Sequence, residues 1–254
     1  MIQSVERTLD IMTCISNNKG EPVTVSQISQ QTGINKSTCC HLIETLVERG
    51  FLNQVSRSAG YVLGIYAYNL TRYNSYHRDL IFNAMPVLRW AKNKTQCTSV
   101  LTKLIDGEKF VLCYSEYTNN SLKERGDLYK GALYDTATGR SMLSTLKPKE
   151  LKQVVDKVGL PTQDEWPGVD SFAKLEEELD KISKQKFVKV VGTYNGNYRC
   201  QLGKYFLSSQ LERFAIGIEI ITEKQPDEAR MIYIERVLLT SVKEVKRRMN
   251  FDNV

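Results

Sequence analysis

The chain has 254 residues, 41% of them hydrophobic and 25% charged, which is typical of an ordinary soluble globular protein. No uninterrupted apolar run approaches the ~18 residues of a membrane helix, and the N-terminus lacks the basic and apolar regions of a signal peptide, so we expect a cytoplasmic protein without a membrane partner. The net charge of +6 allows a polyanionic partner without identifying one.

The first 33 residues predict two helices. Ser4 can cap the first helix, because apolar residues follow it at helical spacing. These residues are Val5, Leu9, Met12 and Ile15. Thr24 and Gln27 form a T-x-x-Q capping box that begins a short second helix, and Gly33 is suited to end that helix in a left-handed conformation.

A third helix is predicted only two residues later. Asn35 can cap this helix and Gly50 stops it. Its inward stripe consists of Cys39, Leu42, Ile43, Leu46 and Val47. Two helices joined by a short turn containing Gly form a helix-turn-helix. Residues 51–52 and 61–63 then predict two short strands around a polar loop, residues 53–60, and this hairpin completes a winged helix-turn-helix.

The outer face of the third helix supplies the candidate DNA contacts. Its first turn places Lys36, Ser37 and Thr38 where backbone N–H groups and the positive end of the helix dipole attract phosphate. The residues that point away from the inward stripe and can reach base edges are Ser37, Cys40, His41, Glu44 and Thr45. Arg57 on the wing is placed for a backbone or minor-groove contact. Because winged helices also bind proteins and RNA, the alternative is an interaction module without sequence-specific DNA binding.

The remainder of the chain predicts an α+β domain. A linker helix is expected from about residue 66 to 74, and a second helix at 79–94 is expected to break or bend near Pro86. Further helices are predicted at 138–144, 149–158, 175–186 and 227–250. Strands are predicted at 98–105, 109–114, 187–193 and 214–221, the first two joined by a tight turn at Asp106-Gly107-Glu108. The domain boundaries that follow are 1–65, 66–76 for the linker and 77–254.

Several short motifs, in matching order and spacing, resemble those of the IclR family of bacterial transcription regulators. Residues 4–11 resemble its opening S-V-E-R-A-L-x-I-L, and residues 33–46 are similar to its G-L-x-K-S-T-x-x-R-L-L-x-T-L. Residues 60–64 resemble its wing ending, g-x-Y-x-L-G. Farther on, residues 136–140 look like its A-T-A-x-G-K segment and residues 196–200 like its G-V-x-C. The resemblance implies a GAF-like effector-binding domain after the winged head.

The chain departs from this family at positions that bear on recognition. His41 stands where the family usually has Arg. The guanidinium of Arg carries a fixed charge and binds in a bidentate manner, whereas a neutral imidazole offers one hydrogen-bond donor and one acceptor. Tyr134 and Asp135 replace His-Ala, and Val190 replaces an Asp. Gly217 and Glu219 stand where Ser residues are often found. We therefore expect the chemistry of the pocket to have changed.

We expect the ligand to bind where the helix start at 136–139 faces the strands that carry Cys200 and residues 217–219, with free N–H groups of the helix available to it. The candidate ligand-binding residues are Tyr134, Thr136, Ala137, Gly139, Tyr198, Cys200, Gly217 and Glu219. If Glu219 faces inward, it disfavours a plain carboxylate and favours a polyol, a sugar or an amine. The expected effector is a sugar, a sugar derivative or a small organic acid.

An enzyme is not expected. The only histidines are His41 and His77, so Cys200 lacks an evident base, and no phosphate loop, zinc cluster or G-x-S-x-G elbow is present. We expect no catalytic residue, metal or cofactor. The resemblance implies a homodimer or tetramer that binds an inverted-repeat operator in double-stranded DNA, preferably as a repressor, with an affinity that depends on a small metabolite.

Overall fold

The computed structural model of the protein describes residues 2–18, 20–70, 77–117, 123–125 and 129–251. The chain divides into two compact units, Met1–Arg78 and Asp79–Val254. The predicted boundaries were 65/66 and 76/77. Of the predicted linker helix, α4 occupies Ile65–Asn69, and residues 71–76 lie outside the described part.

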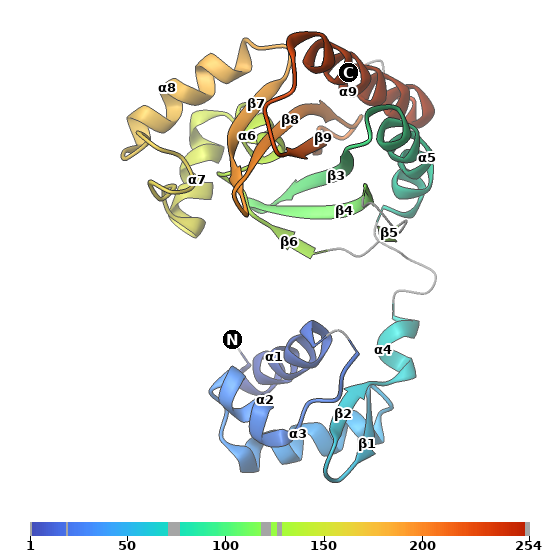
Figure 1. The fold of residues 1–254 in the computed structure, drawn as a ribbon. Coiled ribbons are helices and arrows are strands. Elements are labelled where there is room, and N and C mark those ends of the chain that lie inside the picture. The colour runs from blue at the N-terminus through green and yellow to red at the C-terminus, as the bar shows by residue number, and fades with distance from the viewer. Residues whose placement is uncertain (1, 19, 71–76, 118–122, 126–128, 252–254) are drawn as a thin grey trace. The chain divides into compact units, whose positions relative to one another are not determined.

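The N-terminal unit is a three-helix bundle followed by a two-stranded hairpin (Figure 1). Its helices are α1 (Gln3–Asn17), α2 (Val25–Thr32) and α3 (Lys36–Glu48), and its antiparallel strands are β1 (Leu52–Ser56) and β2 (Gly60–Leu63). The three helices and the hairpin share one core, in which Ile11, Ile28, Ile43 and Leu52 are fully buried.

Local signals in the sequence set the bounds of α2 and α3 as predicted. Thr24 and Gln27 form the reciprocal capping box of α2, and Gly33 follows that helix with φ +72°. Asn35 caps α3, because its Oδ1 accepts from the backbone N–H of Thr38 at 2.9 Å. The turn between α2 and α3 is therefore determined by the left-handed Gly33 at the end of α2 and by the cap of Asn35 at the start of α3.

Two predictions for this unit are wrong in detail. Ser4 does not cap α1, because the helix begins one residue earlier and its N-cap, Ile2, makes no side-chain hydrogen bond. The helix turns Ile11, Cys14 and Ile15 inward, and leaves Val5 and Leu9 exposed at 53% and 59%. The wing loop is also shorter than predicted, since cross-strand pairing continues to Ser56.

The C-terminal unit contains a seven-stranded antiparallel sheet in the order β5-β4-β3-β9-β8-β7, with β6 also paired to β4. The strands are β3 (Thr98–Ile105), β4 (Glu108–Glu116), β5 (Lys123–Arg125), β6 (Tyr129–Gly131), β7 (Val188–Tyr194), β8 (Asn197–Leu207) and β9 (Arg213–Thr222). β5 and β6 were not predicted as strands, and the strand expected at Cys200, which is β8, was predicted without bounds. The turn before β4 is tight as predicted, with Asp106 and Gly107 both at positive φ.

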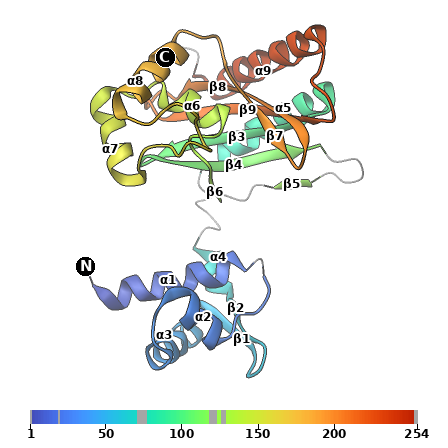
Figure 2. The same cartoon turned by 60° about the vertical axis from the view of Figure 1, so that its left-hand side comes forward.

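Helices cover both faces of this sheet (Figure 2). On one face, α5 (Arg78–Thr95) and α9 (Glu228–Met249) lie side by side over the main core. α5 runs unbroken through Pro86, where a break or bend was predicted. On the other face, α6 (Ala137–Leu143) packs on β7, β8 and β9, and α7 (Pro148–Val158) and α8 (Phe172–Ser183) form a second core around it.

The approach of α6 to the sheet depends on two glycines. A Cβ on Gly203 of β8 would lie 2.5 Å from the carbonyl carbon of Ala137, and a Cβ on Gly217 of β9 would lie 2.6 Å from Cγ2 of Thr138. Real Cβ atoms do not approach other atoms so closely. The absence of these two side chains therefore allows the start of α6 to lie directly on the sheet.

Candidate functional sites

The exposed face of α3 carries most of the predicted DNA contacts. Burial of Cys39, Ile43 and Leu46 in the core turns the opposite side of α3 outward. Exposed there are Lys36, Ser37, Cys40, His41, Glu44 and Thr45, and Arg57 is exposed on the wing. Thr38 is only half-exposed, and its backbone N–H is already used by Asn35. The structure thus brings seven of the eight residues to the surface of one α3–wing unit.

Interactions within α3 leave its exposed side chains only weakly restrained. Nδ1 of His41 lies 3.7 Å from a carboxylate oxygen of Glu44, and both side chains are largely in water. Such an exposed pair contributes little to stability. The hydroxyl of Thr45 donates to the backbone carbonyl of His41 at 3.1 Å. His41 and Glu44 can therefore separate at little cost to meet another partner.

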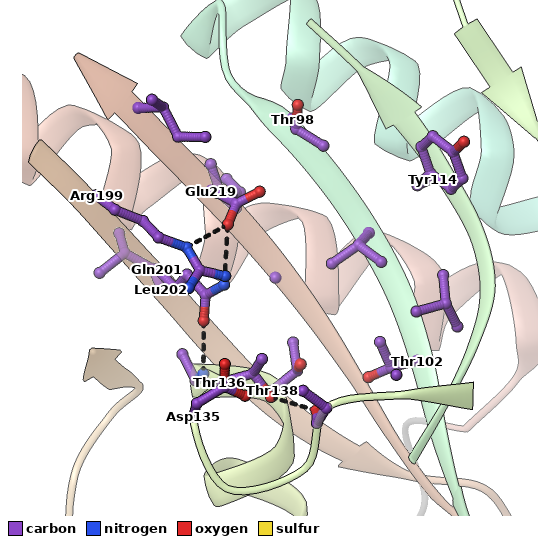
Figure 3. Close-up of a pocket in the computed structure, with 18 of the residues that line it drawn as sticks. Thr98, Thr102, Tyr114, Asp135, Thr136, Thr138, Arg199, Gln201, Leu202 and Glu219 are labelled. Carbon is purple, nitrogen blue, oxygen red and sulfur yellow. Dashed lines mark hydrogen bonds and ion pairs between the residues drawn. The ribbon is translucent and has the colours of Figure 1, made fainter. Parts of the chain in front are cut away.

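The C-terminal unit contains a cavity of about 830 Å³ between the sheet and the segment that leads into α6 (Figure 3). Its lining mixes charged, hydroxyl-bearing and apolar groups from six strands and this segment. The lining residues are Thr98, Val100 and Thr102 of β3, Lys109, Val111, Tyr114 and Glu116 of β4, Tyr117, Gly131, Ala132, Asp135, Thr136, Ala137 and Thr138, Tyr194 of β7, Arg199, Gln201 and Leu202 of β8, and Gly217, Ile218, Glu219 and Ile221 of β9. A volume of this size is typical of small-molecule sites.

A chain of hydrogen bonds crosses the sheet side of the cavity. Oε1 of Glu219 accepts from Nε of Arg199 at 2.8 Å and from Nε2 of Gln201 at 3.0 Å, and Oε1 of Gln201 accepts from the backbone N–H of Ala137 at 3.2 Å (Figure 3). Glu219 faces inward as anticipated, but the guanidinium of Arg199 compensates its charge. Contrary to the prediction, Glu219 is therefore not expected to repel a carboxylate ligand.

A buried lysine lies in the cavity wall nearest α6. Nζ of Lys109 donates to Oγ1 of Thr136 at 2.7 Å, and the side chain is only 5% exposed. Removal of the ammonium from water lowers the pKa of Lys109 to about 8, and the nearby charge of Asp135 partly opposes this shift. Oδ1 of Asp135 is itself buried and has no hydrogen-bond partner among the described residues. This wall therefore holds two polar groups whose bonding capacity is not filled.

The prediction that the helix start offers free N–H groups to a ligand is corrected. The N–H of Ala137 donates to Gln201, and the N–H of Gly139 donates to Oγ1 of Thr136 at 3.3 Å. Gly139 has a packing role instead, since a Cβ there would lie 1.8 Å from the carbonyl oxygen of Leu133. Thr136 and Ala137 do line the cavity, together with Gly217 and Glu219.

Three predicted ligand residues lie elsewhere. Side chains alternate across a strand, so Arg199 and Gln201 face the cavity and Tyr198 and Cys200 face the main core. Cys200 is fully buried there, and burial raises the pKa of its thiol, which keeps it protonated and unreactive. The hydroxyl of Tyr134 donates to the carbonyl oxygen of Gly159 at 2.8 Å, and its ring packs in the second core.

The polar cavity residues missing from the sequence-based set of ligand contacts include Lys109, Asp135, Arg199 and Gln201. One signal could have found two of them. Asn195-Gly196 is a strong hairpin signal, and both residues have positive φ in the turn between β7 and β8. From that turn, strand alternation places Arg199 and Gln201 on one face. Lys109 lies in an apolar strand, and its burial follows only from tertiary packing.

Comparison with known proteins connects these features to one family. The IclR helix-turn-helix domain matches residues 4–56. The acetate operon repressor of Salmonella typhimurium is 23% identical over 161 residues, 63% of this chain and 58% of that protein. The transcriptional repressor IclR of Escherichia coli is 22% identical over 188 residues, 73% of this chain and 68% of that protein. The aligned part of the chain thus spans about three fifths to two thirds of these relatives.

Solved structures show that the whole fold is shared. The IclR transcriptional regulator from Alicyclobacillus acidocaldarius has a TM-score of 0.76 at 17% identity, covering 98% of this chain and 99% of that one. An IclR homolog from Microbacterium hydrocarbonoxydans, solved with 4-hydroxybenzoate, has a TM-score of 0.76 at 15% identity, covering 97% and 99%. The predicted α+β architecture with an N-terminal winged head is confirmed.

The names of these relatives are those of transcriptional repressors and regulators. None of the described helices is long and apolar enough to cross a membrane. The helix-turn-helix match over residues 4–56 and the shared two-domain fold thus make the chain similar to the IclR family of transcriptional regulators.

Proposed function

We propose that the protein is a cytoplasmic, DNA-binding transcriptional repressor whose affinity for its operator changes when a small molecule occupies the cavity of the C-terminal unit. The observation that carries this proposal is the exposed face of α3. Its first turn presents Lys36 and Ser37 to solvent, and His41 and Glu44 follow one turn later on the same side.

In this proposal the residues of α3 divide into two roles. Lys36 and the amide of Ser37 bind phosphate oxygens and set the position of the helix. Cys40, His41, Glu44 and Thr45 contact base edges in the major groove, and Arg57 extends the contact from the wing. The unit carries little net charge, with six basic and five acidic side chains in residues 1–75, so contacts at specific positions must supply much of the affinity.

The cavity supports regulation by a ligand. Its volume and its mixed lining suit a small organic molecule, and the homolog from Microbacterium hydrocarbonoxydans holds 4-hydroxybenzoate. A ligand that binds the DNA-competent and DNA-incompetent states unequally shifts operator affinity, typically by about 1–3 kcal/mol. We propose that a homodimer or a tetramer presents the winged heads in symmetric pairs, and that the operator is an inverted repeat.

Selection of bound duplexes from a random DNA pool tests the function. The full chain is expected to enrich an inverted repeat whose half-sites lie about 10 base pairs apart or a multiple of that spacing. Enrichment of unpaired half-sites would contradict the symmetric arrangement. Absence of any enriched sequence, together with binding of single-stranded RNA or of a protein, would favour the interaction-module alternative.

A further inference from the structure

The buried ammonium of Lys109 has unused bonding capacity inside the cavity. An ammonium carries three N–H donors, and one of them is directed to Oγ1 of Thr136. No carboxylate of the described residues lies within ion-pair distance of Nζ, although the side chain is 95% removed from water. A buried cation without a counterion is costly, so an anionic group that reaches it from the cavity gains a strong interaction.

Asp135, in the same wall of the cavity, lacks a hydrogen-bond donor to its Oδ1 in the described part of the chain. It precedes Thr136, the partner of Lys109, and its charge influences Lys109 without an ion pair between them. Its buried Oδ1 lacks a donor among the described residues. A ligand that brings a hydroxyl or an ammonium to this oxygen would satisfy it.

The other charges near Lys109 are already engaged. Arg199 of β8 and Glu219 of β9 lie close enough to influence the charge of Lys109, and they pair with each other at 2.8 Å (Figure 3). The apolar side chains of Val100 and Val111 provide room for a hydrocarbon body. Around Lys109, the unfilled polar capacity therefore consists of its remaining N–H donors and Oδ1 of Asp135.

We propose that the cavity recognises a small carboxylate with a hydrogen-bond donor on the adjacent carbon, a 2-hydroxy or 2-amino acid, whose carboxylate accepts from Lys109 and whose donor binds Asp135. This inference rests on the proposed ligand-binding function of the cavity. A plain carboxylate would leave Oδ1 of Asp135 unsatisfied, and an uncharged sugar would leave Lys109 without a counterion.

Titration calorimetry on the full chain tests this pairing with two matched series: 3-phenyllactate, phenylalanine and 3-phenylpropionate, and lactate, alanine and propionate. In at least one series, the hydroxy or the amino acid is expected to bind about tenfold or more tightly than the acid without a donor. The tighter of the two identifies the donor as hydroxyl or ammonium.

Variants separate the role of Lys109 from that of Asp135. Asp135→Ala is expected to bind the three members of a series within about twofold of one another, because it removes the acceptor. Lys109→Met is expected to lose measurable binding of all of them. Lys189→Met, which removes an exposed lysine of β7 that does not line the cavity, is expected to bind like the unaltered chain. Circular dichroism establishes that each variant is folded.

The pH profile provides a second readout that loss of folding would not mimic. Lys109 carries its charge below a pKa of about 8, so the affinity for 3-phenyllactate is expected to fall as the pH rises through that value. Lys109→Arg keeps a fixed charge and is expected to give a flat profile between pH 7 and pH 9.5.

Three results would overturn the inference: equal affinity for acids with and without the donor, unchanged binding by Lys109→Met, or no binding of any of the six acids. Each of these leaves DNA binding untouched. Conversely, discrimination among the acids by a chain that selects no DNA sequence would refute the repressor function and leave the ligand assignment standing.

Discussion

Gly203→Ala should show how tightly the start of α6 is held against the sheet. A Cβ at Gly203 would lie 2.5 Å from the carbonyl carbon and 2.7 Å from the carbonyl oxygen of Ala137, and 2.7 Å from the backbone nitrogen of Thr138. All three atoms belong to backbone, which cannot rotate away as a flexible side chain would. The start of α6 must therefore shift, and with it the Gln201–Ala137 hydrogen bond.

Overpacking of this kind costs typically about 1–3 kcal/mol. For a unit of the size of residues 79–254, each kcal/mol corresponds to roughly 2–4 °C in melting temperature, so we expect a decrease of roughly 2–12 °C. Differential scanning calorimetry of the full chain measures it. The transition of the N-terminal unit is expected to stay in place, because the substitution lies outside that unit.

Gly192→Ala is the matched control, because it makes the same change in the adjacent strand β7. A Cβ at Gly192 would have no atom within 4 Å, and its backbone does not require glycine. We expect its melting temperature to lie within about 1 °C of that of the unaltered chain. Equal melting temperatures for the two variants would refute the close contact between α6 and β8.

Four further substitutions test the winged unit and the buried lysine. Asn35→Ala removes the acceptor for the N–H of Thr38 and is expected to destabilise the N-terminal unit by about 1 kcal/mol in thermal unfolding. Lys36→Ala is expected to weaken binding about equally across DNA sequences, whereas His41→Ala changes the preferred sequence; a change of specificity alone in Lys36→Ala would reverse this assignment. Lys109→Met is expected to stabilise the C-terminal unit at pH 7 by an amount on the order of 3 kcal/mol, because the folded pKa of Lys109 is lowered to about 8. The stability difference between Lys109→Met and the unaltered chain should shrink as the pH rises from about 8 to about 10, because in this range the unfolded chain still binds the proton that the folded chain has lost. A stability difference independent of pH would show that the buried ammonium is not its cause.

The winged unit was largely predictable because local chemistry determines it. The capping box of Thr24 and Gln27, the left-handed Gly33 and the cap at Asn35 each act within three or four residues. Which face of α1 is buried was not predictable in the same way. Its first two turns present apolar residues such as Val5 and Leu9 to solvent, and only packing against α2 and α3 determines which face is buried.

The cavity was predictable only in part, because it depends on which face of each strand turns inward. Glu219 and Gly217 were placed correctly on β9. Because the strand at Cys200 was predicted without bounds, however, residues 198–201 could not be assigned to its two faces, and Cys200 was placed in the cavity instead of Arg199 and Gln201. Lys109 and Asp135 come together only after the segment before α6 folds onto β4.

Sequence-specific DNA recognition can be tested by fluorescence anisotropy with the duplex enriched by selection and with a shuffled duplex of equal composition. We expect tighter binding to the enriched duplex at each of two salt concentrations, and a fall in affinity as salt rises. We also expect a reduced salt slope for Lys36→Ala. Equal affinity for both duplexes, or no binding even at low salt, would contradict a function in sequence-specific DNA recognition.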